Sequence, residues 1–116
     1  MEIDQINPLA YGKANSPKKL TLEILKPKQT LELQFKDKEV ITFGRAQSSF
    51  GYIHIPKSRN VSRQHFFITR RNDEFYINDL GSTNGTFVNG QKITSERELM
   101  PGDVIKAADI EMKVSF

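Results

Sequence analysis

The sequence predicts an all-β domain, either a sandwich or a barrel, with about ten or eleven short strands. Apolar and polar residues alternate in short segments, which is the period of a half-buried strand. Turn-forming residues interrupt these segments at intervals of roughly ten residues, and no segment supports a helix longer than a turn or two. At 116 residues the chain is expected to form a single domain with one hydrophobic core.

The N-terminal segment, residues 1–18, is predicted to be an irregular arm that precedes a folded domain over residues 19–116. Proline, glycine and asparagine recur in the arm, and no apolar period persists there. The first two strands are expected over residues 20–25 and 30–35, on either side of Pro27, because apolar and polar side chains alternate in both segments.

The remaining strands follow the same alternation and end at turn signals. They are expected over residues 40–43, 52–55, 65–69, 75–77, 86–88, 91–93, 104–106 and 110–116. The dipeptide Asn89-Gly90 connects two of them and is a strong signal of a two-residue hairpin turn. Residues 95–99 fit one helical turn at most. No period of about 20–50 residues repeats, which excludes solenoid and propeller folds.

The composition excludes several functional classes. The chain has no cysteine, so it has no disulfide, no thiolate nucleophile and no cysteine-bound metal. The two histidines, His54 and His65, lie apart in the sequence, and we expect neither a metal nor a cofactor. The longest apolar runs are a few residues and no secretory signal is present, so we expect a cytoplasmic protein that does not contact membranes.

The basic residues are not expected to bind nucleic acid. Several of them form what we interpret as a solvated rim: Lys57, Arg59, Arg63, Arg70 and Arg71. The net charge of +3 is mild, and the pI of about 9.2 is borderline for nucleic-acid-binding domains. Enzymatic activity is not expected either. Residues 81–86 lack the lysine and following helix of a nucleotide P-loop, and Ser62 lacks the Gly-x-Ser-x-Gly elbow of a hydrolase.

Function is expected in the loops at one end of the sandwich, since the strands serve as a scaffold. Three loop clusters, residues 44–45, 60–65 and 79–86, are not explained by the strand pattern. They carry two guanidinium groups, two hydroxyls and one amide: Arg45, Arg63, Ser62, Thr83 and Asn84. These donors suit a tetrahedral oxyanion on an extended peptide, because arginine can bind two phosphate oxygens and an amide can bond to a peptide main chain.

In order and spacing, these clusters resemble the motifs of forkhead-associated domains, which are phosphothreonine-peptide recognition modules. The matching segments are Gly44-Arg45, Val61-Ser62-Arg63-Gln64-His65 and Leu80-Gly81-Ser82-Thr83-Asn84-Gly85-Thr86-Phe87-Val88-Asn89-Gly90. The resemblance covers about residues 20–116 and implies a two-sheet β-sandwich of mostly antiparallel strands. One departure is the loop over residues 46–55, which lacks the acidic residue that members often carry there.

The resemblance also implies a role for each binding residue. Arg45 and Ser62 are expected to bind the phosphate, and Arg63 is expected to bind the phosphate or the adjacent peptide backbone. Thr83 is expected to lie against the phosphothreonine, while Asn84 holds the main chain of the peptide beside it.

Other matching residues are expected to support the site without touching the ligand. Gly44 and His65 have architectural roles in this interpretation, with His65 buried and bracing the loop that presents Ser62. The remaining members of this supporting set shape turns: Gly85, Thr86, Asn89 and Gly90.

The implied function is that of a signalling docking module that captures a protein phosphorylated on threonine by an upstream serine/threonine kinase. The phosphothreonine is expected on a partner or on the same polypeptide, and the domain is expected to regulate a larger signalling protein. The alternative is a phosphate-independent assembly module on the same fold. The combination of Arg45, Ser62, Thr83 and Asn84 argues against this alternative, because assembly alone does not need these residues.

Overall fold

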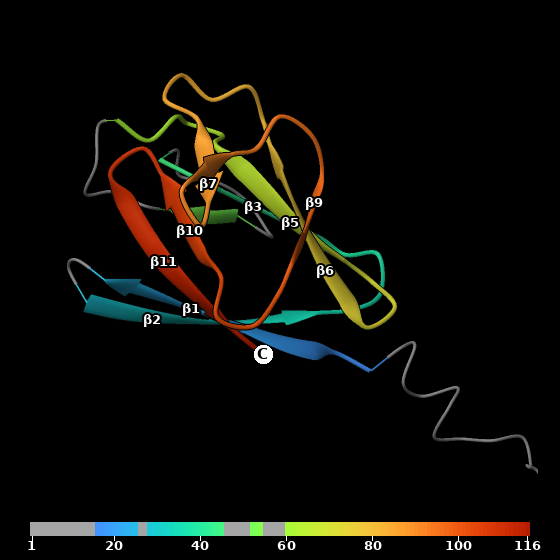
Figure 1. Cartoon of the computed structure of the whole chain (residues 1–116). Coiled ribbons are helices and arrows are strands. Elements are labelled where there is room, and N and C mark those ends of the chain that lie inside the picture. Colours follow the sequence, from blue (N-terminus) through green and yellow to red (C-terminus); the bar gives the residue numbers. More distant parts are fainter. Residues whose placement is uncertain (1–15, 26–27, 46–51, 55–59) are drawn as a thin grey trace, which may run out of the picture.

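Two β-sheets pack face to face in the part of the chain that the structure describes (Figure 1). The computed structural model describes residues 16–25, 28–45, 52–54 and 60–116. The strands are β1 (Lys18–Leu25), β2 (Lys28–Phe35), β3 (Val40–Gly44), β4 (Tyr52–His54), β5 (Phe66–Arg71), β6 (Glu74–Asp79), β7 (Thr86–Val88), β8 (Gln91–Lys92), β9 (Arg97–Leu99), β10 (Val104–Ala107) and β11 (Ile110–Ser115). The six-stranded sheet has the order β2-β1-β11-β10-β7-β8, and the five-stranded sheet has the order β4-β3-β5-β6-β9.

The predicted all-β sandwich of mostly antiparallel strands is confirmed. Among the described strands, β3 and β4 form the parallel pair, while the other pairs are antiparallel. Strands β1 and β2 pair along their full length, from Lys18 opposite Phe35 to Leu25 opposite Lys28. A shift of one residue would turn their apolar side chains to solvent, so the alternation that predicts these strands also sets their register.

One strand differs from the sequence prediction. Residues 95–99, expected to form at most a helical turn, instead contain β9, which pairs antiparallel with β6. Leu99 is buried opposite Phe75, and Arg97 lies opposite Ile77. The prediction is wrong because this short segment takes its conformation from pairing with a distant strand and not from its local sequence.

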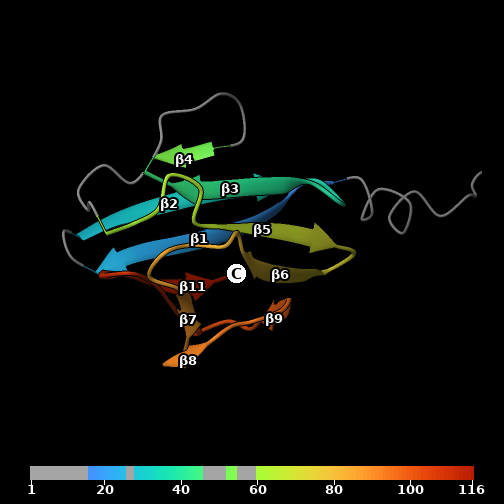
Figure 2. The ribbon, with the colours of Figure 1, turned by 90° about the horizontal axis from the view of Figure 1, so that it is seen from above.

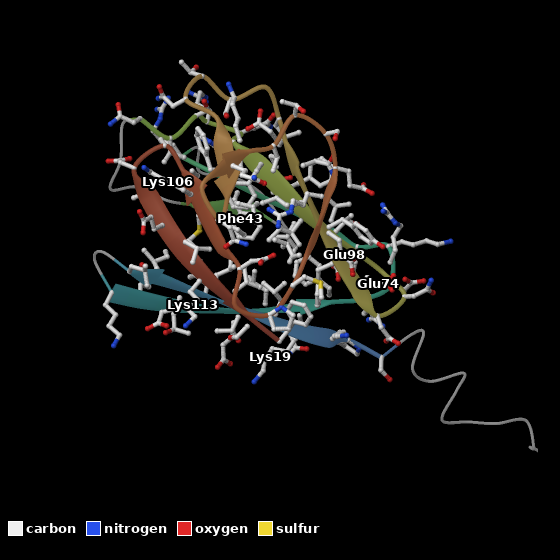
Figure 3. The ribbon with its side chains drawn as sticks, in the orientation of Figure 1. Lys19, Phe43, Glu74, Glu98, Lys106 and Lys113 are labelled. Atoms are coloured by element: carbon white, nitrogen blue, oxygen red, sulfur yellow. The ribbon has the colours of Figure 1, made fainter. Side chains whose placement is uncertain are left out.

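The hydrophobic core lies between the two sheets. In β1, Leu20 and Leu22 are fully buried, and Phe43 stacks on Phe66 with ring centroids 4.7 Å apart. Figure 3 shows Phe43 in the interior, whereas Lys113 lies on the outer side of β11. Burying one such apolar side chain contributes about 1.5–3 kcal/mol, so these alternating positions supply the main stabilisation of the fold.

Arg70 departs from its expected place on a solvated rim. The structure buries it almost completely, at 1% exposure. Its guanidinium donates hydrogen bonds to backbone carbonyls of three described residues, with Nε 2.5 Å from Asn72 O and Nη1 2.7 Å from Ser16 O and 2.8 Å from Phe35 O. Arg70 therefore joins the segment entering β1, the end of β2 and the β5–β6 turn, which compensates for the loss of hydration of its charge.

The two ends of the sandwich differ. The β5–β6 turn and the segment entering β1 lie at one end, while the connection before β5 and the β6–β7 connection lie at the other (Figures 1 and 2). The second end thus collects loop segments that are far apart in the sequence. Within the described residues there is no helix of the length and apolarity needed to cross a membrane.

Candidate functional site

Hydrogen bonds join the connection before β5 to the β6–β7 connection at one end of the sandwich. The segment over residues 60–65 precedes β5, and the segment over residues 80–85 joins β6 to β7. The Thr83 amide donates to Ser62 Oγ at 3.0 Å, and Asn84 Nδ2 donates to Asn60 O at 2.7 Å. The end of β3 joins the same group, because the Arg45 amide donates to Ser62 O at 3.0 Å. Three sequence-distant segments are therefore linked into one surface.

An open pocket of about 350 Å³ lies on this surface. The described residues that line it are Arg45, Asn60, Val61, Ser62, Arg63, Thr83 and Asn84. All five residues assigned to phosphopeptide binding are therefore brought together around one depression. In the described part of the chain, the lining includes two arginines and no carboxylate, so it presents positive charge and hydrogen-bond donors, which suit an anion. Among the described residues, no group of three metal-ligating side chains is positioned to hold a metal ion.

Hydrogen bonds from both the backbone and the side chain of Arg45 hold this residue in place. It follows the buried Gly44 at the end of β3, and its half-buried side chain donates from Nε to Val61 O at 2.9 Å. This bond orients the guanidinium plane and leaves its two terminal nitrogen atoms for a ligand. A guanidinium fixed in this way binds two oxygens of a phosphate with little further ordering.

His65 lies behind the pocket and connects its two loops. The side chain is fully buried, and Nδ1 accepts a hydrogen bond from the Ser62 amide at 3.0 Å. Nε2 lies 2.8 Å from Gly85 O, which can only accept, so Nε2 carries the proton in this neutral tautomer. His65 therefore holds the Ser62 loop and the Gly85 loop at a constant separation.

Two residues inside the predicted loop clusters that were assigned no role from the sequence also contribute to the candidate site. Asn60 lines the pocket and accepts the hydrogen bond from Asn84 through its carbonyl. Asp79, at the end of β6, accepts hydrogen bonds from the Ser82 amide, the Ser82 hydroxyl and the Thr86 hydroxyl at 3.0, 2.6 and 2.6 Å. The Asp-x-x-Ser spacing is a signal for such a turn, because aspartate side chains accept from amides a few residues later.

The environment of Asp79 changes its acidity in two opposing ways. Burial raises the pKa of its carboxyl, but hydrogen bonds from Ser82, Thr86 and the Gly81 backbone favour the ionised form. The hydrogen bonds prevail, so the pKa of Asp79 lies below the ordinary value of 3.8.

The other supporting residues lie at turns. Gly85 has a φ of +86°, and a side chain there would meet Lys92 and Phe87 at 3.1–3.2 Å, so glycine is required. Asn89 and Gly90 have φ values of 52° and 83°, as in a type I′ hairpin turn between β7 and β8, and they do not line the pocket. The loop over residues 46–51, with its missing acidic residue, and residues 55–59 lie outside the described residues.

Acid is expected to weaken the domain partly through Asp79. Because the folded-state pKa of Asp79 is lowered, its stabilising contribution is complete above about pH 4 and is lost as the pH falls through the folded-state value. Asp79→Asn is expected to lower stability at neutral pH by about 1 kcal/mol and to flatten the loss of stability below about pH 4. Urea unfolding of both proteins at a series of pH values measures this, and parallel pH profiles would contradict it.

Comparisons with known proteins agree on one family. Residues 41–108 match the sequence model of the FHA domain. The chain is 32% identical over 91 residues to the protein phosphatase 1 regulatory inhibitor subunit PPP1R8 homolog of Arabidopsis thaliana. This alignment covers 76% of the chain and 24% of that relative, so the chain spans about a quarter of the curated protein that it matches.

Solved structures show the same similarity. An FHA domain from a structural and functional study of phosphothreonine-dependent FHA interactions has a TM-score of 0.72 at 30% identity, covering 85% of this chain and 97% of that one. Mycobacterium tuberculosis EmbR in complex with a low-affinity phosphopeptide has a TM-score of 0.73 at 30% identity, covering 84% of this chain and 24% of EmbR.

Proposed function

The chain belongs to the forkhead-associated domain family, a family of phosphothreonine-dependent protein-interaction modules, and we propose that its phosphopeptide site is the cationic pocket described above. The FHA domain is a binding module and not an enzyme. The observation that supports the location of the site is the convergence of the five predicted binding residues on one pocket, whose lining includes no acidic side chain among the described residues. The five are Arg45, Ser62, Arg63, Thr83 and Asn84.

In this proposal Arg45 and Ser62 bind the phosphate. The Arg45 Nε is occupied by Val61 O, so the terminal N–H groups face the ligand. Ser62 Oγ accepts the Thr83 amide, so its own proton is available to donate to a phosphate oxygen. Arg63, which is exposed at the rim, adds a second positive charge near the phosphate or the adjacent peptide backbone.

Asn84 and Thr83 bind the peptide beside the phosphate. The Asn84 amide nitrogen donates to Asn60 O, which leaves Oδ1 to accept from a peptide N–H. The exposed Thr83 side chain lies on the same wall of the pocket, where it contacts the phosphothreonine itself. His65 supports both walls from behind, through Ser62 and Gly85.

The energetics are compatible with a reversible docking module. Three or four charge-assisted hydrogen bonds at roughly 1.5–3 kcal/mol each give a gross gain of about 5–12 kcal/mol. Ordering a flexible peptide reduces this gain, and the expected net affinity is about micromolar. A phosphothreonine carries about −1.5 to −2 charges at neutral pH, so the unphosphorylated peptide is expected to bind far more weakly.

The partner in this proposal is a protein phosphorylated on threonine by an upstream kinase, either in trans or within the same polypeptide. We further propose that the domain regulates a larger cytoplasmic signalling protein, since the chain spans only a quarter of its curated relative. A phosphate-independent assembly role on this fold is not favoured, because assembly alone does not need a cationic pocket.

An arrayed peptide library tests the proposed function. The library presents phosphothreonine, phosphoserine and unphosphorylated versions of each sequence to the folded domain. Selective binding to phosphothreonine peptides is expected, and the preferred flanking residues then indicate the partner. No phosphorylation-dependent binding by a folded sample would support the assembly alternative instead.

A further inference from the structure

We propose that Asp79 is a positioning residue of the phosphopeptide site, which holds the Thr83–Asn84 segment in its binding geometry through Ser82 and Thr86. This inference rests on the proposed function. Asp79 does not line the pocket, so any effect on the ligand must pass through the loop that it organises.

The carboxylate lies at the centre of the hydrogen bonds of this loop. Its Oδ2 accepts the Ser82 amide, and its Oδ1 accepts the hydroxyls of both Ser82 and Thr86. Ser82 Oγ in turn accepts the Gly85 amide at 3.0 Å. These bonds connect both ends of the segment that contains Thr83 and Asn84.

The loop is also held at its two ends, where the Leu80 amide donates to His65 O at 2.9 Å and His65 Nε2 donates to Gly85 O. Gly81 and Gly85 flank it with φ values of +71° and +86°, a conformation in which glycine retains wide freedom when unsupported. Thr83 and Asn84 are exposed, and the Thr83 amide and Asn84 Nδ2 donate hydrogen bonds across the pocket to Ser62 Oγ and Asn60 O. Movement of Thr83 would therefore also change the orientation of the Ser62 hydroxyl.

The direction in which Asp79→Asn changes the affinity for a phosphopeptide distinguishes a positioning role of Asp79 from a purely electrostatic one. A carboxylate near a phosphate site repels a dianionic ligand through space. If charge were the dominant effect of Asp79, the neutral Asp79→Asn variant would bind a phosphopeptide more tightly. If positioning dominates, the variant binds more weakly, because an amide cannot accept the same three hydrogen bonds with its single oxygen.

Asp103 provides a matched control. It is a buried carboxylate that caps another turn, accepting from the Met100 amide and from Asn89 Nδ2, both at 2.8 Å. It lies outside the pocket lining. Asp103→Asn is therefore expected to reduce stability in the same manner as Asp79→Asn without affecting the ligand.

A phosphothreonine peptide selected from the array is titrated into each variant, under conditions where every variant is folded. Calorimetry then measures its dissociation constant. We expect about a tenfold increase for Asp79→Asn and a similar increase for Ser82→Ala, with the double variant no worse than either single one. Asp103→Asn is expected to stay within about twofold of wild type. Thr86→Val is expected to weaken binding, and Thr86→Ser, which keeps the hydroxyl, is expected to restore it.

The outcomes distinguish this inference from the proposed function. Phosphothreonine binding by the wild type, with unchanged or tighter binding by Asp79→Asn and Ser82→Ala, would overturn the role of Asp79 and leave the proposed function intact. Equal losses in Asp79→Asn and Asp103→Asn would assign the effect to general stability and also overturn the inference. A folded wild type that binds no phosphopeptide would overturn both.

Discussion

Replacing Arg45 with alanine is expected to weaken phosphothreonine-peptide binding by about 30-fold to several thousand-fold. The physical reason is the loss of a charge-assisted, two-pronged contact to the phosphate, which typically costs about 2–5 kcal/mol. Starting from a micromolar affinity, such a loss raises the dissociation constant to between about 30 μM and several millimolar. Calorimetric titration of the phosphopeptide into wild type and Arg45→Ala measures it directly.

Arg71→Ala is the matched control for this prediction. Arg71 is an exposed arginine that pairs with Glu96 and lies over the Tyr76 ring at 3.9 Å, away from the pocket. Its removal deletes the same charge and is expected to change the affinity by no more than about twofold, since exposed ion pairs contribute little. Equal losses in Arg45→Ala and Arg71→Ala would indicate that only net charge matters.

Replacing His65 with alanine is expected to have the largest effect on stability among the site residues. The change leaves the Ser62 amide and Gly85 carbonyl without their partner and opens a cavity at a fully buried position. Unsatisfied buried groups cost about 1–3 kcal/mol each and large-to-small core changes about 3–5 kcal/mol, so a loss of about 3–5 kcal/mol is expected. Urea unfolding measures this loss.

His65→Ala is also expected to weaken peptide binding in the folded protein, because the two walls of the pocket lose their common support. Thr69→Val serves as the control. Thr69 is buried in β5 and donates one hydrogen bond to Glu39 O at 2.9 Å, far from the pocket lining. The Thr69→Val variant is expected to lose about 1 kcal/mol of stability and to bind the phosphopeptide with unchanged affinity. A His65→Ala variant as stable as Thr69→Val would refute the bracing role.

The strands were predictable because their signal is local. Alternation in β1, β2 and β11 follows directly from one face being buried against the other sheet. The features that were missed depend on distant partners. Strand β9 exists because β6 pairs with it, and Arg70 is buried because its acceptors include Ser16, Phe35 and Asn72.

The residue types of the candidate site could be proposed from the sequence, but the hydrogen bonds that support it could not. Arginine, hydroxyl and amide side chains in three loop motifs identify Arg45, Ser62 and Asn84 as candidates. Their distances and the bonds between them cannot be derived from spacing, because each loop is positioned by a different strand. Asp79 was missed for the same reason, since a carboxylate at a strand end becomes informative only when its acceptor bonds are known.

The most direct test of the proposed binding site is a nuclear magnetic resonance titration of the isotopically labelled domain. A phosphothreonine peptide from the array is added, and its unphosphorylated counterpart serves as the reference. The largest amide shifts are expected at residues 60–63 and 82–85, with little change for the unphosphorylated peptide. Equal shifts with both peptides, or shifts centred on the β5–β6 turn at the opposite end of the sandwich, would contradict the assignment of the pocket.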